Sequence, residues 1–428
     1  MKRVRSSRKI RALAAFAATV ALGAGVVAST PAEAQRLDPR RPGVFVVGHP
    51  GGPAPMLRVD GRRSGEAHDP LPSGTLRTAW RKTIGLTVEH PALAGADGTL
   101  AVVTATRGDV VFLDADGEEK ARVSVDGRPS GPATLTSDGT VVYTTSAGDV
   151  VGVRRTSPRP KFMTRVAVER NPRAAPLALS DGGVVVASLY ELVVVDSEGN
   201  VRSRVALPEA INAPLLATGD KVVAITSTGA VHAWTPGREP VRVGSFGAPV
   251  DGGAALTDGG TLVAVIEGNH VVELDLATGA RTTRAISSQG LYLGPPALRR
   301  VQAGFAATLL ALTPNRGFVV TLDPSGQETQ RAPVATMTPS TLPDGGQVAL
   351  VAPPHVGPIL DSRGAIAFAA TDGHVGLVTP DGAVETIGEL LCSKNGRSSG
   401  VTGLTPFGRG SFVVTCDGGV ITRIVGAN

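Results

Sequence analysis

The sequence predicts an all-β fold, a single β-propeller of four-stranded antiparallel blades, with eight blades and seven as the alternative count. The first observation is a repeated unit of three short apolar runs separated by Gly-rich or Asp-Gly turns. The second is its spacing of about 40 residues, with one longer step of about 60, which is typical of a repeated small sheet. Eight units begin in turn at Pro91, Pro132, Pro176, Pro214, Ala254, Pro296, Pro358 and near Thr402.

The third observation is the chemistry of the runs themselves. Residues 141–145, 184–186 and 222–226 are rich in Val and Thr and are bounded by Gly, Asp and Ser, so they predict short buried strands. The Asp-Gly pairs between them suit two-residue hairpins, because Gly adopts positive φ without steric cost. The main role predicted for Asp97, Asp138 and Asp181 is therefore to form turns.

A strand near the start of the repeats predicts how the ring closes. The last unit ends with room for only three strands, whereas residues 76–84 form a strand candidate with no unit of its own. Pairing the two would complete the last blade and leave no exposed sheet edge. We therefore expect the ring to be closed by an N-terminal strand.

The first 34 residues have the pattern of a cleavable signal peptide. A basic stretch precedes an Ala- and Val-rich run, and Ala32-Glu33-Ala34 predicts cleavage between Ala34 and Gln35. A retained membrane anchor is the alternative, disfavoured by the small residues. The formal charge of +5 resides in this segment, so the rest is neutral and a nucleic-acid partner loses its support.

The remaining chain divides into two parts. Residues 35–73 are rich in Pro, Gly and Arg and are expected to be a lead-in or linker, followed by the propeller at 74–428. The long step after Pro296 leaves extra residues, predicted to lie between Arg331 and Pro354. They are either a functional loop or an ordinary surface insertion.

Two cysteines in an exported chain favour a disulfide. Strand direction alternates within a blade, so the connector between blades and the turn after the second strand lie on one face. Cys392 is in such a connector and Cys416 ends a second strand, which makes Cys392–Cys416 the candidate pair. Two free buried thiols are the alternative.

Catalytic and metal-binding signals are weak. Residues 396–400 match G-x-S-x-G, but a nucleophile elbow needs a strand before it and a helix after it, and neither is expected around this match. The histidines have no zinc-like spacing, and aromatic residues make up only 4% of the chain, which is unfavourable for a stacking platform. We predict no catalytic residues and no metal ligands.

Several turns resemble those of pyrroloquinoline-quinone-like (PQQ-like) propeller repeats. Residues 274–279 are similar to the family's A-x-D-x-x-T-G motif, residues 114–117, 196–199 and 323–326 are shorter versions, and residues 55–65 followed by Trp80 resemble the family's lead-in. The resemblance covers residues 55–428. It implies either a quinoprotein dehydrogenase or a noncatalytic scaffold like the outer-membrane assembly propeller.

The departures from the enzymes favour the noncatalytic branch. The family's docking Trp is replaced by Ala121, Ser203 and Thr283, and there is no adjacent Cys-Cys pair. We therefore expect a periplasmic or secreted monomer without a cofactor or stable transmembrane anchor, which binds a protein or another cell-envelope component. The alternative is an enzyme that carries PQQ and calcium in the central channel.

Overall fold

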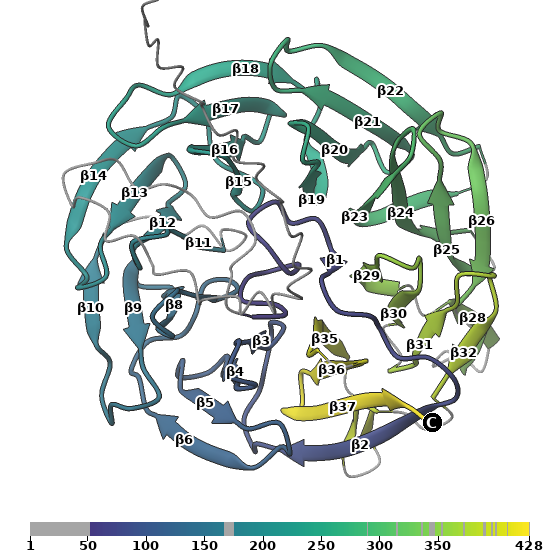
Figure 1. The fold of residues 1–428 in the computed structure, drawn as a ribbon, viewed down its shortest axis with the longest axis horizontal. Coiled ribbons are helices and arrows are strands. Elements are labelled where there is room, and N and C mark those ends of the chain that lie inside the picture. The colour runs from purple at the N-terminus through teal and green to yellow at the C-terminus, as the bar shows by residue number, and fades with distance from the viewer. Residues whose placement is uncertain are drawn as a thin grey trace, which may run out of the picture. The chain divides into compact units, whose positions relative to one another are not determined.

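The eight predicted blades are present in the computed structural model, arranged around a common centre (Figure 1). The structure describes residues 52–166, 175–288, 290–313, 316–334, 337–341, 347–351, 354–370, 373–387, 391–394, 397–398, 400–408 and 410–427, all within the compact unit Asp38–Asn428. The predicted signal peptide and its cleavage site lie outside these residues.

Each blade is an antiparallel sheet of four strands, ordered from an innermost strand at the centre to an outermost strand at the rim. From the inside outward, blade 1 contains β3 (Leu93–Ala94), β4 (Leu100–Val103), β5 (Val110–Leu113) and β6 (Glu119–Val123), and blade 2 contains β7 (Thr134–Leu135), β8 (Val141–Thr144), β9 (Asp149–Val153) and β10 (Phe162–Arg165). Blade 3 contains β11 (Leu177–Ala178), β12 (Val184–Ala187), β13 (Glu191–Val195) and β14 (Val201–Ala206), and blade 4 contains β15 (Leu216–Thr218), β16 (Lys221–Ile225), β17 (Ala230–Trp234) and β18 (Val241–Ser245).

Blades 5 to 8 continue the pattern. Blade 5 contains β19 (Val250–Leu256), β20 (Thr261–Ile266), β21 (His270–Asp275) and β22 (Arg281–Ile286), and blade 6 contains β23 (Leu291–Val301), β24 (Gly304–Leu312), β25 (Gly317–Leu322) and β26 (Glu328–Pro333). Blade 7 contains β29 (Pro354–Asp361), β30 (Ile366–Ala370), β31 (Val375–Val378) and β32 (Val384–Thr386), and blade 8 contains β35 (Val401–Pro406), β36 (Ser411–Cys416), β37 (Val420–Gly426) and β2 (Leu76–Thr83).

Burial explains why the central strands are continuously apolar. The middle strands β4, β8 and β12 are buried along their whole length, because neighbouring blades cover both faces of the sheet. The outer strand β2 instead alternates between exposed and half-buried residues after Leu76. The described residues contain strands and turns but no helix, so none of them forms an apolar helix long enough to span a bilayer.

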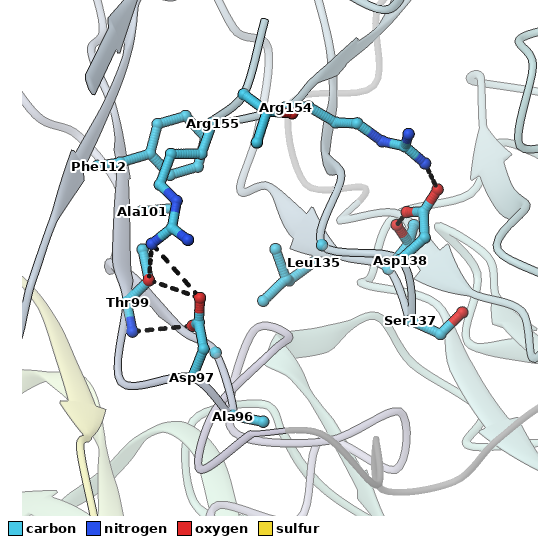
Figure 2. Close-up of a pocket in the computed structure, with 14 residues that line it drawn as sticks. Ala96, Asp97, Thr99, Ala101, Phe112, Leu135, Ser137, Asp138, Arg154 and Arg155 are labelled. Atoms are coloured by element: carbon cyan, nitrogen blue, oxygen red, sulfur yellow. Dashed lines mark hydrogen bonds and ion pairs between the residues drawn. The ribbon is translucent and has the colours of Figure 1, made fainter. Parts of the chain in front are cut away.

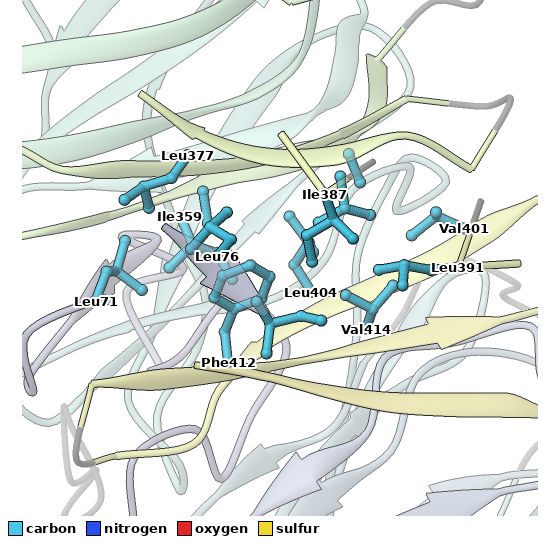
Figure 3. Packing of buried hydrophobic residues seen from close by; sticks show 14 of the residues in the cluster. Leu71, Leu76, Ile359, Leu377, Ile387, Leu391, Val401, Leu404, Phe412 and Val414 are labelled. Carbon is cyan, nitrogen blue, oxygen red and sulfur yellow. The ribbon is translucent and has the colours of Figure 1, made fainter. Parts of the chain in front are cut away.

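Closure of the ring by an N-terminal strand is confirmed. β2 pairs antiparallel with β37, from Leu76 opposite Gly426 to Thr83 opposite Val420, and becomes the outer strand of blade 8. Figure 3 shows the apolar cluster between blades 7 and 8, where Leu71 and Leu76 join side chains such as Leu377 and Phe412. The early segment therefore belongs to the core of the last blades.

The long step after Pro296 contains a hairpin. β27 (Met337–Thr341) pairs with β28 (Gln347–Val351) between blades 6 and 7, so the extra residues are not the single loop that was one expectation. The predicted limits were also too wide: Arg331 pairs with Val320 inside β26, and Pro354 begins β29. These ends are held by blade hydrogen bonds.

The two faces of the ring follow from the alternating strand directions. The connectors between blades and the turns after each second strand form one face, which we call the connector face. The other two turns of blades 1 to 7, and the turn between β35 and β36 in blade 8, form the opposite face, which we call the turn face. A second short hairpin, β33 (Ser393–Lys394) with β34 (Arg397–Ser398), lies in the connector between blades 7 and 8.

Candidate functional site: the plugged centre of the ring

Residues 54–65, which we call the plug, cross the middle of the ring (the purple trace in Figure 1). The inner strands of six blades donate backbone N–H groups to plug carbonyls at 2.7 to 3.0 Å. The donors Ala94, Leu135, Ala217, Leu256, Leu298 and Leu360 pair with the carbonyls of Ala54, Pro55, Gly61, Arg62, Ser64 and Gly65. Directly after the plug, β1 (Glu66–Ala67) adds a parallel strand to blade 7.

This segment differs from the lead-in that the sequence suggested. The expected boundary at residue 73 leaves it outside the ring, whereas the structure has Ala54, Met56, Val59 and Ala67 almost completely buried. The segment is ordered by backbone pairing with distant strands. Its own sequence has no periodic pattern that would predict this pairing. The donors to the plug include the last residues of β3, β7 and β19, so the plug crosses the ring near its turn face.

A buried polar network holds the plug in shape. Asp60 is fully buried and accepts hydrogen bonds from the backbone N–H of Ser64 (3.0 Å), Ser64 Oγ (3.1 Å) and Arg62 Nε (3.2 Å). Arg63, also buried, donates to the carbonyls of Leu57 (2.9 Å), Leu215 (3.0 Å) and Pro176 (3.2 Å). Burial lowers the pKa of Arg63 to about 10, which leaves it charged at neutral pH.

Above the plug lies a pocket of about 230 Å³. Its floor includes Leu57, Arg58 and Arg63, and its walls come from the beginnings of the inner strands, on the connector-face side. The wall residues are mostly proline, glycine or aliphatic: Pro91, Pro132, Pro214, Gly252, Gly253, Ala254, Pro295, Val356, Gly357, Ile359 and Leu404, together with His90 and Thr402. Among the described residues that line it there is no carboxylate.

A second hollow, of about 310 Å³, lies between blades 1 and 2 on the turn face (Figure 2). Arg155 contacts Asp97 at 3.5 Å and donates to Thr99 Oγ1 at 2.8 Å, while Arg154 pairs with Asp138. Burial alone would raise the pKa of Asp138, but hydrogen bonds from Thr136, Thr140 and Arg154 outweigh it and lower the pKa to about 2. A carboxylate so stabilised is a poor general base at neutral pH.

The predicted cysteine pair is brought together. The sulfurs of Cys392 and Cys416 lie 2.04 Å apart and their Cα atoms 5.5 Å apart, which joins the connector before blade 8 to the end of β36. Arg397 and Ser398 of the G-x-S-x-G match lie in the short strand β34 and not in a strand–helix elbow. Among the described residues, no group of three or more His, Cys, Asp or Glu side chains could hold a metal ion.

Sequence reasoning missed the plug residues Arg58, Asp60 and Arg63. Two signals were available: the charged residues between Met56 and Gly65 in a segment otherwise rich in Pro and Gly, and the resemblance of residues 55–65 to the lead-in of PQQ-like propellers. Charged residues in such a segment normally indicate a solvated linker, and their burial follows only from the ring that surrounds them.

Comparison with known proteins supports the fold. No protein-family model matches the chain. No curated protein matches it either. Among solved structures, BamB from Moraxella catarrhalis is 18% identical with a TM-score of 0.55, covering 82% of this chain and 98% of its own.

Two enzymes share the fold at still lower identity. A europium-containing methanol dehydrogenase is 14% identical with a TM-score of 0.61, covering 88% of this chain and 89% of its own. The quinohemoprotein alcohol dehydrogenase of Comamonas testosteroni is 11% identical with a TM-score of 0.59, covering 89% of this chain and 82% of its own. Identities this low show a PQQ-like propeller fold and leave the function to be argued from the site.

Proposed function

We propose that this protein is an exported, noncatalytic propeller that binds a protein or another cell-envelope component through its connector face. The observation that carries the proposal is the plug. It occupies the centre of the ring with hydrogen bonds to the inner strands of six blades, so the chain's own backbone stands where an enzyme of this fold would need a channel. The ring then serves as a rigid support for its loops.

The alternative, an enzyme with PQQ and calcium in the channel, is not supported by the residues present. Calcium takes six to eight oxygen ligands, usually with several carboxylates. The described lining of the central pocket supplies no carboxylate, and its 230 Å³ is below the roughly 300–1,000 Å³ typical of pockets for drug-sized ligands. We therefore assign no role to the quinone or to calcium.

The connector face carries the largest departures from the repeat. The β27–β28 hairpin projects from the connector between blades 6 and 7, and the β33–β34 hairpin from the next connector. Cys392, beside the second hairpin, is joined to β36. Two neighbouring hairpins on a rigid support form a surface that the other described connectors do not repeat, and we place partner binding there.

The proposal is tested by removing the first hairpin. Residues 335–352 are replaced with a short Gly-Ser bridge, which keeps all of β26 and leaves β29 from Pro354. We expect the melting temperature to stay close to that of the mature chain, while cross-linking to envelope components from the native cell is lost. A control variant, Arg155→Ala with Arg159→Ala on the turn face, should cross-link like the parent chain.

Two outcomes contradict the proposal. Unchanged cross-linking by the hairpin variant would move the partner surface elsewhere. A stoichiometric chromophore after incubation with PQQ and calcium would favour the enzyme.

A further inference from the structure

We propose that the central pocket binds a small organic anion, one carboxylate group on a compact apolar body, with Arg58 as the residue that pairs with the carboxylate. The inference goes beyond partner binding at the connector face, because it concerns a small ligand at the centre of the ring. It is carried by three features of the pocket: a hydrogen-bond donor without a partner, an excess of buried positive charge and a strained backbone beneath it.

The donor is Nη1 of Arg58. Nε of Arg58 donates to the carbonyl of Arg63 at 3.3 Å and Nη2 donates to that of Pro296 at 2.8 Å. Nη1 is buried and has no hydrogen-bond partner in the described structure. It lies against Gly357, where an added Cβ would overlap it, and Gly357 and Arg58 both line the pocket. An unsatisfied guanidinium N–H on a side chain that lines a pocket favours an anionic acceptor, since charge-assisted hydrogen bonds are strong.

The charge balance around the plug points the same way. The printed hydrogen bonds of Arg58 and Arg63 go to carbonyl oxygens, so neither guanidinium pairs directly with a carboxylate. Asp60 offsets only part of the two positive charges. The buried carboxylate nearby, Asp60, already accepts from Arg62 and Ser64. Burial lowers the pKa of Arg58 to about 10, so it remains charged at neutral pH. A buried charge is costly unless it is paired, and a bound carboxylate would supply the missing partner.

The backbone beneath the pocket is strained. Arg58 and Val59 have φ values of 53° and 80°, in the left-handed region that a β-branched residue such as Val59 rarely adopts. Such conformations cost energy and cluster at functional sites. In this ring the strained pair directs the Arg58 side chain to the pocket floor.

The walls select the rest of the ligand. Pro91, Pro132, Pro214 and Pro295 come from four different blades and, with Val356 and Ile359, surround the space with apolar atoms. With about 230 Å³ available, the pocket has room for a short aliphatic chain or a single aromatic ring. A small apolar monocarboxylate therefore fits both the charge and the lining.

The test is calorimetric titration of the full mature chain with butanoate, hexanoate and benzoate, each compared with its alcohol, and with inorganic phosphate. We expect one carboxylate per chain, bound roughly 10- to 100-fold more tightly than its alcohol because one charge-assisted hydrogen bond is added. Inorganic phosphate, which lacks an apolar body, should bind more weakly than hexanoate or benzoate. The variant without residues 335–352 should bind the carboxylates unchanged, so this test and that of the connector face fail independently.

Two variants locate the site. Arg58→Met should abolish carboxylate binding, but it also removes hydrogen bonds that hold the plug. Gly357→Ala keeps those residues and should weaken binding at least tenfold, because its methyl group displaces Nη1, while Arg155→Met on the turn face serves as the control. Carboxylates that bind no better than their alcohols, phosphate that binds as tightly as hexanoate, or folded Gly357→Ala with unchanged affinity would each overturn the proposal.

Discussion

At the scale of single residues, Arg63 shows how one side chain extends the contacts of the plug to a further blade. No backbone hydrogen bond joins the plug to an inner strand of blade 3 in the described structure. The Arg63 guanidinium donates instead to Pro176, just before β11 of blade 3, and to Leu215, just before β15 of blade 4. A charged side chain thus provides a contact for blade 3, which has no backbone pair with the plug.

Arg63→Met should therefore lower the free energy of unfolding by about 3–5 kcal/mol, because it leaves several buried carbonyls without donors. Urea unfolding of the mature chain measures this change. Arg155→Met is the control: Arg155 and its partner Asp97 are both largely exposed, so a loss of about 1 kcal/mol or less is expected. Equal losses for the two variants would contradict the role given to Arg63.

Asp138 provides a pH-dependent contribution. Its folded-state pKa of about 2 lies below its value in the unfolded chain, so the ionised group stabilises the fold above about pH 4 and this stabilisation is lost as the pH falls through about 2. Asp138→Asn should be less stable than the parent at pH 7, with the difference shrinking between about pH 4 and 2. Thermal melts across this range measure it, and a constant difference would contradict the assignment.

At the scale of elements, the outer strand of a blade contacts the last turn of the next blade. Trp80 of β2 lies on Gly117 of blade 1 and donates from Nε1 to the carbonyl of Ala115 at 2.7 Å. Phe162 of β10 lies on Gly199 in the same way. The docking Trp that PQQ-like repeats carry after the motif glycine is absent from these two turns. Aromatic rings from the preceding blade contact the two turns instead.

Replacing Gly117 tests this contact. Gly117→Ala should cost about 1–2 kcal/mol for its positive φ of 80° and more for the clash with the Trp80 ring. Gly98→Ala is the control, because Gly98 has a similar φ of 75° but open space where the methyl group would go. Equal destabilisation in chemical unfolding would show that the Trp80 contact contributes nothing.

The cysteine pair remains a prediction for the exported protein. Closing a loop of 24 residues should stabilise the fold by roughly 3 kcal/mol in the chain-entropy model. Under denaturing, nonreducing conditions we expect no thiol to react with a thiol reagent, and two after reduction. Two reactive thiols before reduction would exclude the bond.

The blades could be predicted from the sequence because their signals are local. Val-rich runs such as residues 141–145 and Asp-Gly turns such as Asp138-Gly139 set strand and turn within a few residues. The plug could not be predicted in this way. Arg58 and Asp60 are buried only because inner strands from distant parts of the chain surround them. Nη1 of Arg58 lies against Gly357 only because the folded ring brings these two distant residues together.

At the scale of the whole molecule, one early stretch performs two tasks. Residues 54–65 fill the centre, and β2 completes blade 8 at the periphery. Between them, Leu71 and Asp361 link the stretch to blade 7, since the backbone N–H of Leu71 donates to Asp361 Oδ2 at 2.9 Å. Centre and rim are therefore joined through a single run of chain.

Nested truncations separate these tasks. Removal of residues before 52 should leave the melting temperature unchanged, whereas removal through residue 66 should cost several kcal/mol because the plug bonds are lost while β2 remains. Removal through residue 85 should in addition expose the edge of β37 and cause aggregation. Melting and light scattering distinguish the three forms, and identical behaviour would disprove both roles.

The pairing of β2 with β37 also sets an order in time. The two strands lie near opposite ends of the described chain. During synthesis β2 therefore has no partner until β37 has been made and the blades between them have formed. Contacts so distant in sequence make folding slow, and unpaired strand edges are prone to aggregate in the meantime. Pairing of β2 with β37 therefore protects the complete ring from aggregation, and the chain is most prone to aggregate before this pairing forms.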